Sequence, residues 1–231
     1  CERAAAPVHI VFASTRLVYG PSGHEAVNEL WPVRPRSIYA AHKLCVEHYH
    51  QIASERQRIS CTLCRISNPY GDDPAAPSKS YGFVNAMIHR AAARQPITLF
   101  GDGRQLRDYI HIDDLTTMLR LCGERHQARA AVFNVGFGAS IAIRDAASEI
   151  QRVFGDGGIE FCPWPDDYES VEGGDFVMDI SRARAALGYS PQHDFRNGLD
   201  AVKACRAAAI DGSAPPVPVE TAGTGSLASF R

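Results

Sequence analysis

Short apolar runs rich in β-branched residues alternate along this chain with longer segments of helical periodicity. The first run, at residues 8–13 (VHIVFA), fits a strand buried on both faces, as in a parallel sheet. Further strands are predicted at residues 62–66, 97–100, 107–112, 131–135 and 159–162. Helices are predicted at residues 39–58, 83–94, 143–154, 181–187 and 195–209, and from a cap at Asp113 or Asp114 to about Cys122. This alternation predicts an α/β fold with a largely parallel sheet.

The composition sets limits on partners. The chain has 231 residues, of which 45% are hydrophobic and 22% charged, as in ordinary soluble globular proteins. A formal net charge of -2 gives no bulk field toward nucleic acid or membranes. No apolar run approaches the roughly 18 residues of a membrane span, and the first residues show no signal-peptide pattern. We therefore expect no nucleic-acid or membrane partner and a cytoplasmic location.

The seven cysteines are scattered, and only Cys61 and Cys64 form a C-x-x-C pair. That pair lies in a predicted strand, where positions three apart point to opposite faces. Free thiols in a reducing compartment are favoured over a metal pair. The histidines show no H-x-x-x-H spacing, and no metal site is predicted.

Three short segments carry residues suited to proton transfer. Ser14 and Thr15 follow the first predicted strand, and Tyr39-x-x-x-Lys43 opens the next helix. The third segment, RISNPYG at residues 65–71, places Asn68 just beyond the following strand. Ligands in open α/β sheets bind beyond the carboxyl ends of the strands, which is where Thr15 and Asn68 are expected.

The spacing of Tyr39 and Lys43 puts both side chains on one helix face. A free tyrosine has a pKa of about 10, and a nearby ammonium lowers it by favouring the phenolate. Such a tyrosine can take a proton from a sugar hydroxyl while a hydride leaves the same carbon. A Y-x-x-x-K pair also occurs as a half-buried tyrosine beside a solvated lysine, and Ser-Thr after a strand is often only a turn. The three segments together, in this order, favour a catalytic site.

On these motifs the sequence resembles the extended short-chain dehydrogenase/reductase family, and within it the nucleotide-sugar epimerases and dehydratases. The matching segments are FASTRLVYG (12–20), SIYAAHK (37–43), CRISNPYG (64–71), ITLFGDGRQLRDYIHIDDL (97–115), FNVGFG (133–138) and DISRARAALGYSP (179–191).

The resemblance implies the C-terminal part of a Rossmann-like doubly wound sheet and a smaller α/β substrate-binding domain. Residues 1–72 would belong to the dinucleotide-binding domain. Residues 73–211 would belong mostly to the substrate-binding domain, with segments returning to the first. Residues 212–231, rich in Gly, Pro, Ala, Ser and Thr, are expected to form a disordered tail.

The resemblance also implies NAD as a tightly held, recycled cofactor and a nucleotide sugar as the substrate. Tyr39 would be the base, Lys43 would bind the nicotinamide ribose and Thr15 the sugar hydroxyl. The remaining implied contacts are Ala13, Ser14 and Ile66 with the cofactor, and Asn68, Arg107 and Asp175 with the substrate, Asn68 and Arg107 near its diphosphate. A homodimer is expected, with helices 39–58 and 83–94 forming a four-helix bundle.

The glycine-rich turn of the family, G-x-x-G-x-x-G after the first strand, has no match here. We therefore expect the N-terminal half of the dinucleotide-binding domain, roughly 100 residues, to be missing before Cys1. This chain alone would then be poorly stable and inactive.

Two further departures concern the reaction. The family's sugar dehydratases have Asp-Glu directly after the threonine, and these two residues supply the acid and the base for the elimination of water. This chain has Arg16 and Leu17 there, which cannot supply that pair. This favours epimerisation through a transient keto intermediate. The alternatives are a keto-sugar reductase, a sugar decarboxylase, or a non-catalytic remnant serving as a binding or structural module.

The other departure is Glu172, which stands where the family usually has an arginine, three residues before Asp175. It is expected to turn toward solvent, because it would otherwise repel a diphosphate. Arg107 suits a phosphate contact through its planar fork, with a salt bridge to a neighbouring acid as the alternative. For His111 a structural hydrogen bond is expected rather than a substrate contact.

Overall fold

The computed structural model describes residues 8–20, 22–56, 59–71, 82–165, 169–172 and 174–210. The predicted domain boundary at residue 72 and the predicted disordered tail at residues 212–231 both lie outside the described residues.

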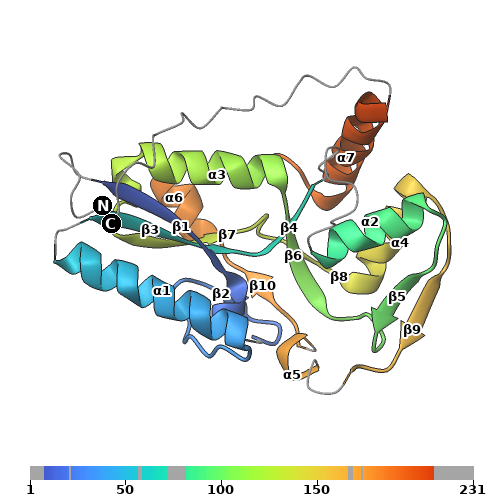
Figure 1. Ribbon diagram of the computed structural model, residues 1–231, viewed down its shortest axis with the longest axis horizontal. Helices are drawn as coiled ribbons and strands as arrows, with labels where there is room; N and C mark the ends of the chain where they lie inside the picture. Colours follow the sequence, from blue (N-terminus) through green and yellow to red (C-terminus); the bar gives the residue numbers. More distant parts are fainter. Residues whose placement is uncertain are drawn as a thin grey trace, which may run out of the picture.

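A parallel three-stranded sheet and the helices on its two faces form one half of the molecule. The strand order is β1 (His9–Thr15), β3 (Ser60–Ile66) and β7 (Ala131–Val135), and both pairings are parallel. Helix α1 (Ile38–Glu55) lies on one face, while α3 (Ile112–Glu124) and α6 (Ser181–Leu187) lie on the other (Figure 1). The predicted α/β class with a largely parallel sheet is confirmed.

Strand β1 is less buried than the sequence predicts. Ala13 is exposed and residues 9–12 are only half-buried, so burial of both faces is wrong for most of this strand. The reason is its position, because within the described residues β1 pairs with β3 alone and therefore lies at the edge of the sheet.

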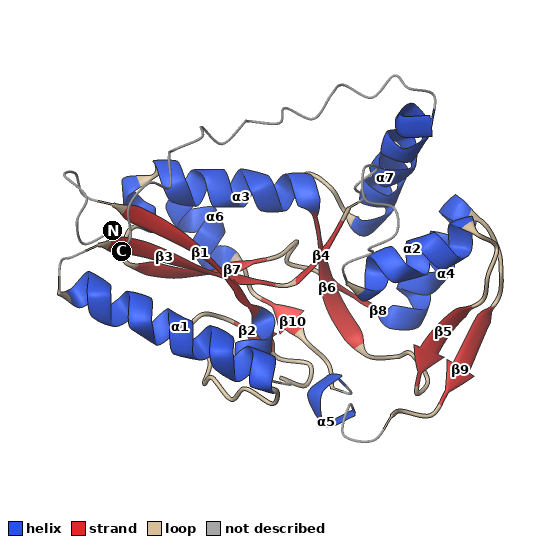
Figure 2. Ribbon diagram, in the orientation of Figure 1, coloured by secondary structure: helices blue, strands red, loops and turns tan. Residues whose placement is uncertain are grey.

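The other half combines two small sheets with three helices (Figure 2). Its first sheet has the order β4 (Asn68–Tyr70), β6 (Leu106–His111), β8 (Ser140–Ala142), and its second pairs β5 (Ile97–Phe100) with β9 (Ile159–Cys162). Only the β6–β8 pairing among the described strands is antiparallel. The helices are α2 (Phe83–Ala92), α4 (Ile143–Phe154) and α7 (Phe195–Ile210).

Short elements complete the structure. Strand β2 (Ala26–Val27) pairs in parallel with β10 (Val177–Met178). A 3-10 turn, η1 (Arg16–Val18), follows β1 directly, and a second, η2 (His126–Ala128), precedes β7. The four-residue helix α5 (Glu169–Glu172) lies before β10.

Each half has its own hydrophobic core, and strand β6 contributes to both. Ile110 packs in the core that contains Phe133 and Met118, whereas its neighbour Tyr109 packs in the core that contains Ile150. Successive residues of a strand point to opposite faces, so one strand can join two cores. This arrangement holds the carboxyl ends of β1 and β3 beside the second half. Within the described residues, no helix is long and apolar enough to cross a membrane.

Candidate active site

Thr15 ends β1 at the carboxyl edge of the parallel sheet, opposite Ile66 of β3 in the strand register. Its Oγ1 accepts a hydrogen bond from the Leu17 backbone N–H at 3.3 Å and so caps η1. The Thr15 hydroxyl donates to no acceptor among the described residues. Its hydrogen is therefore available to an oxygen atom of a ligand.

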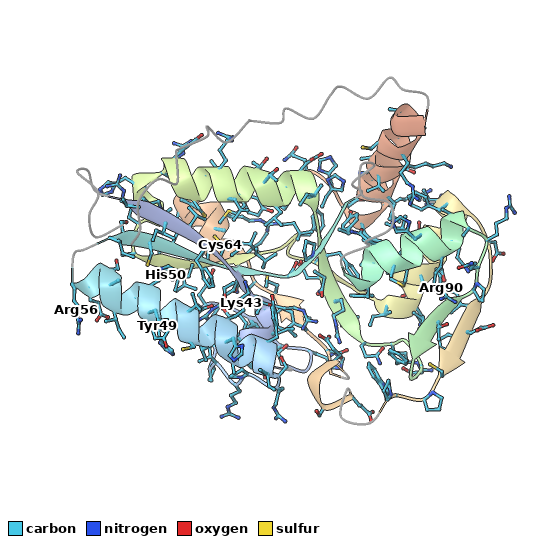
Figure 3. The ribbon with its side chains drawn as sticks, viewed as in Figure 1. Lys43, Tyr49, His50, Arg56, Cys64 and Arg90 are labelled. Atoms are coloured by element: carbon cyan, nitrogen blue, oxygen red, sulfur yellow. The ribbon has the colours of Figure 1, made fainter. Side chains whose placement is uncertain are left out.

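Tyr39 and Lys43 lie together at the start of α1. Ser37 caps this helix by accepting a hydrogen bond from the Ala40 N–H at 3.2 Å, which places Tyr39 in the first turn. The Lys43 ammonium lies 5.8 Å from the centre of the Tyr39 ring and donates to the carbonyl oxygen of Ala13 at 2.7 Å. Figure 3 shows Lys43 on the side of α1 that faces the strands. Tyr39 is 53% exposed, and its hydroxyl has no hydrogen-bond partner within the described part of the chain.

A buried ion pair joins α1 to the sheet beneath these residues. Arg65 on β3 donates to both carboxylate oxygens of Glu47 on α1, at 2.7 to 3.2 Å. The side chains of Glu47 and Arg65 are only 1% and 7% exposed. The hydroxyl of Ser14, which the resemblance assigns to the cofactor, donates to this same carboxylate. Glu47 was not identified from the sequence, although its place four residues after Lys43 puts it on the same helix face as Tyr39 and Lys43.

The network continues through Tyr19 and Asn134 into the core. The Arg65 guanidinium lies 4.7 Å from the centre of the Tyr19 ring, and the Tyr19 hydroxyl donates to Asn134 Oδ1 at 2.7 Å. Burial raises the pKa of Tyr19 to about 12, so this tyrosine keeps its proton at neutral pH. Tyr19 is therefore a structural residue, in contrast to the exposed Tyr39.

A cavity of about 260 Å³ opens between α2, β5 and the segment around α5. One end is polar and carries Asn68, Arg107 and Glu172. The rest is mainly apolar and includes two aromatic side chains, Phe100 and Trp164, whose ring centres are 5.5 Å apart. Binding sites for small organic molecules commonly combine an apolar lining with a few polar groups in this way.

The expectation that Glu172 turns to solvent is wrong. Its carboxylate lies 2.7 Å from the Arg16 guanidinium and 3.1 Å from that of Arg107. Because two buried cations face it, leaving for solvent would strip both of their counter-ion. The alternative reading of Arg107, a salt bridge to an acid, describes the geometry seen here. Asn68 takes part as well, accepting from Arg16 Nε at 3.3 Å and donating to the Asp108 carbonyl oxygen at 2.7 Å.

Asp175 follows Glu172 by three residues, and its carboxylate bonds to the backbone N–H of Leu106. One carboxylate oxygen accepts a hydrogen bond from the Leu106 N–H at 2.8 Å, and the other lies 3.1 Å from Nδ1 of His24. Its predicted contact with substrate stays a prediction.

The predicted cap of α3 at Asp113 or Asp114 is wrong. His111 is the N-cap residue, and its Nδ1 accepts from the Asp113 N–H at 3.3 Å, which is the structural hydrogen bond expected for this histidine. Asp114 instead accepts from the backbone N–H groups of Gln192 and His193, both at 2.9 Å. The side-chain atoms of His111, Asp113 and His193 that could bind a metal ion lie within 4.8 Å of one another. The sequence could not show this group, because His193 comes from a distant segment.

The chain is similar to known proteins over most of its length. Residues 1–136 match the model of the NAD dependent epimerase/dehydratase family. The UDP-glucose 4-epimerase of Azospirillum brasilense is 28% identical over 207 residues, covering 82% of this chain and 58% of that protein. The dTDP-4-dehydro-6-deoxyglucose reductase of Escherichia coli is 30% identical over 193 residues, covering 83% of this chain and 59% of that protein. The chain thus spans less than two thirds of these relatives.

Solved structures show the same fold. The UDP-glucuronic acid 4-epimerase of Bacillus cereus, in complex with UDP-glucuronic acid and NAD, superposes with a TM-score of 0.75 at 27% identity. That match covers 87% of this chain and 62% of the other. The UDP-glucose 4-epimerase of Thermotoga maritima gives a TM-score of 0.75 at 24% identity, covering 84% and 62%. Because the family model matches more than half of its residues, this chain belongs to the NAD-dependent epimerase/dehydratase family.

Proposed function

We propose that the protein carrying this chain is an NAD-dependent epimerase of a nucleotide sugar that acts through a transient keto intermediate. The observation that carries the proposal is the exposed Tyr39 side chain, whose ring centre lies 5.8 Å from the Lys43 ammonium, at the start of the helix that packs on the carboxyl edge of the sheet where Thr15 ends its strand. A phenol that is open to a ligand and close to a fixed positive charge is suited to proton transfer.

NAD is the cofactor of this family, and the residues at the sheet edge fit its nicotinamide ribose. Lys43 is anchored on the carbonyl oxygen of Ala13 and keeps further N–H donors for ribose hydroxyls. Ala13 is exposed at this edge, and Ile66 ends the neighbouring strand. Ser14 is less suited, because its hydroxyl already donates to Glu47. When bound, NAD supplies the acceptor and later the donor of a hydride.

The chain's own residues would manage the proton. Tyr39 would take the proton of the reacting hydroxyl and return it to the same oxygen, while Thr15 would donate a hydrogen bond to that oxygen throughout. Leu17 has no ionisable group, and Arg16 carries a guanidinium, which is not a general base. This pair supports epimerisation over the elimination of water, which needs a further acid and base.

The cavity supports a nucleotide sugar as substrate. Its apolar part, with Phe100 and Trp164, offers surfaces for a nucleobase, and Asn68 in its polar part bonds to Arg16, the residue after Thr15. A bound nucleoside diphosphate would then point its sugar toward the sheet edge. The identity of base and sugar depends on pocket shape, which binding experiments must establish.

We also propose a cytoplasmic homodimer. The free thiols found at the described cysteines support a reducing compartment. Helix α1 supports a dimer through its exposed Tyr49 and Ile52. The second predicted bundle helix does not support it, because α2 buries Val84 and Met87 in the core that it shares with α4.

The test uses the protein expressed from its complete coding sequence, a panel of UDP-, GDP- and dTDP-sugars, and the variant Tyr39→Phe. We expect interconversion of one sugar pair and a loss of roughly 100- to 10,000-fold in kcat for Tyr39→Phe, as for removal of a general base. The matched control is Tyr49→Phe, an exposed tyrosine on the same helix, which should retain wild-type turnover. Equal activity of Tyr39→Phe and wild type would refute the role of Tyr39.

The similarity to an Escherichia coli reductase makes a keto-sugar reductase the second candidate. Cofactor balance separates the two reactions. An epimerase turns over with no net change in NADH absorbance at 340 nm, whereas a reductase consumes one reduced cofactor per sugar.

A further inference from the structure

Two residues that depart from the family pattern, Arg16 and Glu172, contact each other. They form an ion pair of 2.7 Å between residues far apart in the chain, and Glu172 also lies 3.1 Å from Arg107. The side chains of Arg16 and Arg107 are 7% and 2% exposed, and that of Glu172 is 20% exposed. One carboxylate therefore faces two buried guanidinium groups, and one positive charge is left over beside the cavity.

Arg107 has few donors to offer a ligand. Its Nη1 donates to the carbonyl oxygens of Leu106 at 2.8 Å and Gly174 at 2.6 Å. Its Nη2 donates to both the carbonyl and the carboxylate of Glu172. Contact of a phosphate with Nη1 or Nη2 of Arg107 would compete with these buried bonds, each of which is costly to break.

Arg16 is differently placed. Its Nε donates to Asn68 Oδ1 at 3.3 Å, its Nη2 donates to Glu172, and its guanidinium lies 5.2 Å from the centre of the Phe176 ring. Nη1 has no hydrogen-bond partner among the described residues. Arg16 thus keeps more N–H donors for a ligand than Arg107 does.

Arg16 connects Thr15 with the polar end of the cavity. It directly follows Thr15, and two of its partners, Asn68 and Glu172, line the cavity. A ligand that extends from the polar end of the cavity toward Thr15 would therefore come close to this guanidinium.

We propose that Arg16 binds an oxyanion of the substrate, and that Glu172 is the internal counter-ion that occupies Arg16 when no substrate is bound. This inference rests on the proposed function, because it takes a nucleotide sugar as the ligand. The oxyanion has two possible sources, the diphosphate linker or a carboxylate on the sugar. Both match the planar fork of a guanidinium.

The two charges of the pair then have opposite effects on affinity. Arg16 attracts the incoming oxyanion, whereas Glu172 competes with it for the same N–H donors. A purely structural ion pair behaves otherwise, since removing either partner leaves a buried charge unpaired and damages the same site. The signs of the two effects therefore separate a ligand-binding role from a structural one.

The experiment measures binding by calorimetry with the protein expressed from its complete coding sequence. The probes are UDP, UDP-glucose and UDP-glucuronic acid, with dTDP and dTDP-glucose alongside. We expect Arg16→Gln to weaken binding by roughly 10- to 100-fold, as for the loss of a hydrogen bond to a charged group. Glu172→Gln should strengthen binding several-fold. The control Arg120→Gln, at an exposed arginine of α3, should bind as the wild type does.

The pattern across probes identifies the source of the oxyanion. Equal weakening for UDP, UDP-glucose and UDP-glucuronic acid assigns Arg16 to the diphosphate, whereas weakening confined to UDP-glucuronic acid assigns it to a sugar carboxylate. Wild-type affinity of Arg16→Gln for all probes would overturn the proposal. So would matched losses of affinity and melting temperature in both variants. A wild-type protein that binds none of the probes would instead contradict the proposed function.

Discussion

The ion pair between Glu47 and Arg65 gives the sharpest test of how this fold positions its site. Helix α1 carries Tyr39 and Lys43, and Glu47 is its buried polar contact with the sheet, through Arg65 and Ser14. Replacing Glu47 by Gln keeps the shape of the side chain but removes its charge. The Arg65 guanidinium then stays buried without a counter-ion.

The structure sets the size of the effect. Both side chains are almost fully buried, so water cannot replace the missing partner. Removal of one member of a buried pair typically costs about 3–5 kcal/mol of unfolding free energy. Glu124, which pairs with Arg120 on the surface of α3, is the matched control. Its replacement by Gln should change the unfolding free energy by less than about 0.5 kcal/mol.

Urea unfolding of the protein expressed from its complete coding sequence, followed by circular dichroism, measures both variants. The double variant Glu47→Leu/Arg65→Met removes both charges and should recover most of the loss, because apolar residues replace a buried pair at little cost. A loss below about 1 kcal/mol in Glu47→Gln would show that the unpaired Arg65 is readily solvated, and would refute this reasoning. A double variant no more stable than Glu47→Gln would contradict it as well.

Three further outcomes follow from named contacts. Burial raises the pKa of Asp108 from 3.8 to about 6, so the folded state holds a proton that the unfolded state releases; this group should therefore lower the unfolding free energy by about 2 kcal/mol as pH rises from 4 to 7, and the fall should be absent from the pH profile of Asp108→Asn. Gly136→Ala would press a methyl group against the Asp108 carboxylate and, at 2.8 Å, against Met178 Sδ, so urea unfolding should show a loss of about 1–3 kcal/mol in unfolding free energy. The control Gly123→Ala adds its methyl group in open space on α3 and should raise the unfolding free energy. Equal effects of the two substitutions would argue against steric crowding at Gly136. Lys43→Met should reduce the NAD content of the purified protein, measured by its absorbance after denaturation, and an unchanged content would exclude Lys43 from the cofactor site.

Local sequence determined most of the regular elements. Strand β7 (Ala131–Val135) and helix α4 (Ile143–Phe154) have the bounds that the apolar spacing predicts, and α4 ends at Gly155 as expected. These features depend on neighbours within a few residues, so they can be read without the fold. The shared face of Tyr39 and Lys43 is equally local, since it follows from helical spacing alone.

Some elements exist only through distant partners. Strands β2 and β10 have two residues each, too few for a periodic pattern, and each is held in place by pairing with the other. The residue that caps α3 also depends on a distant segment. The sequence offered Asp113 and Asp114 as caps, but Asp114 is occupied by the backbone of the segment before α7, and His111 caps the helix instead.

The chain's sequence by itself determined the α/β class and the family, because these rest on local patterns, and it predicted the catalytic pair of Tyr39 and Lys43 from helical spacing. Arg16 and Glu172 each stood out in the sequence only as a departure from that family. The tertiary structure showed that they form one ion pair across 156 positions of the chain, and that Arg107 shares it. Such contacts depend on which buried charges the fold brings within a few ångströms of each other, and no local pattern carries that information.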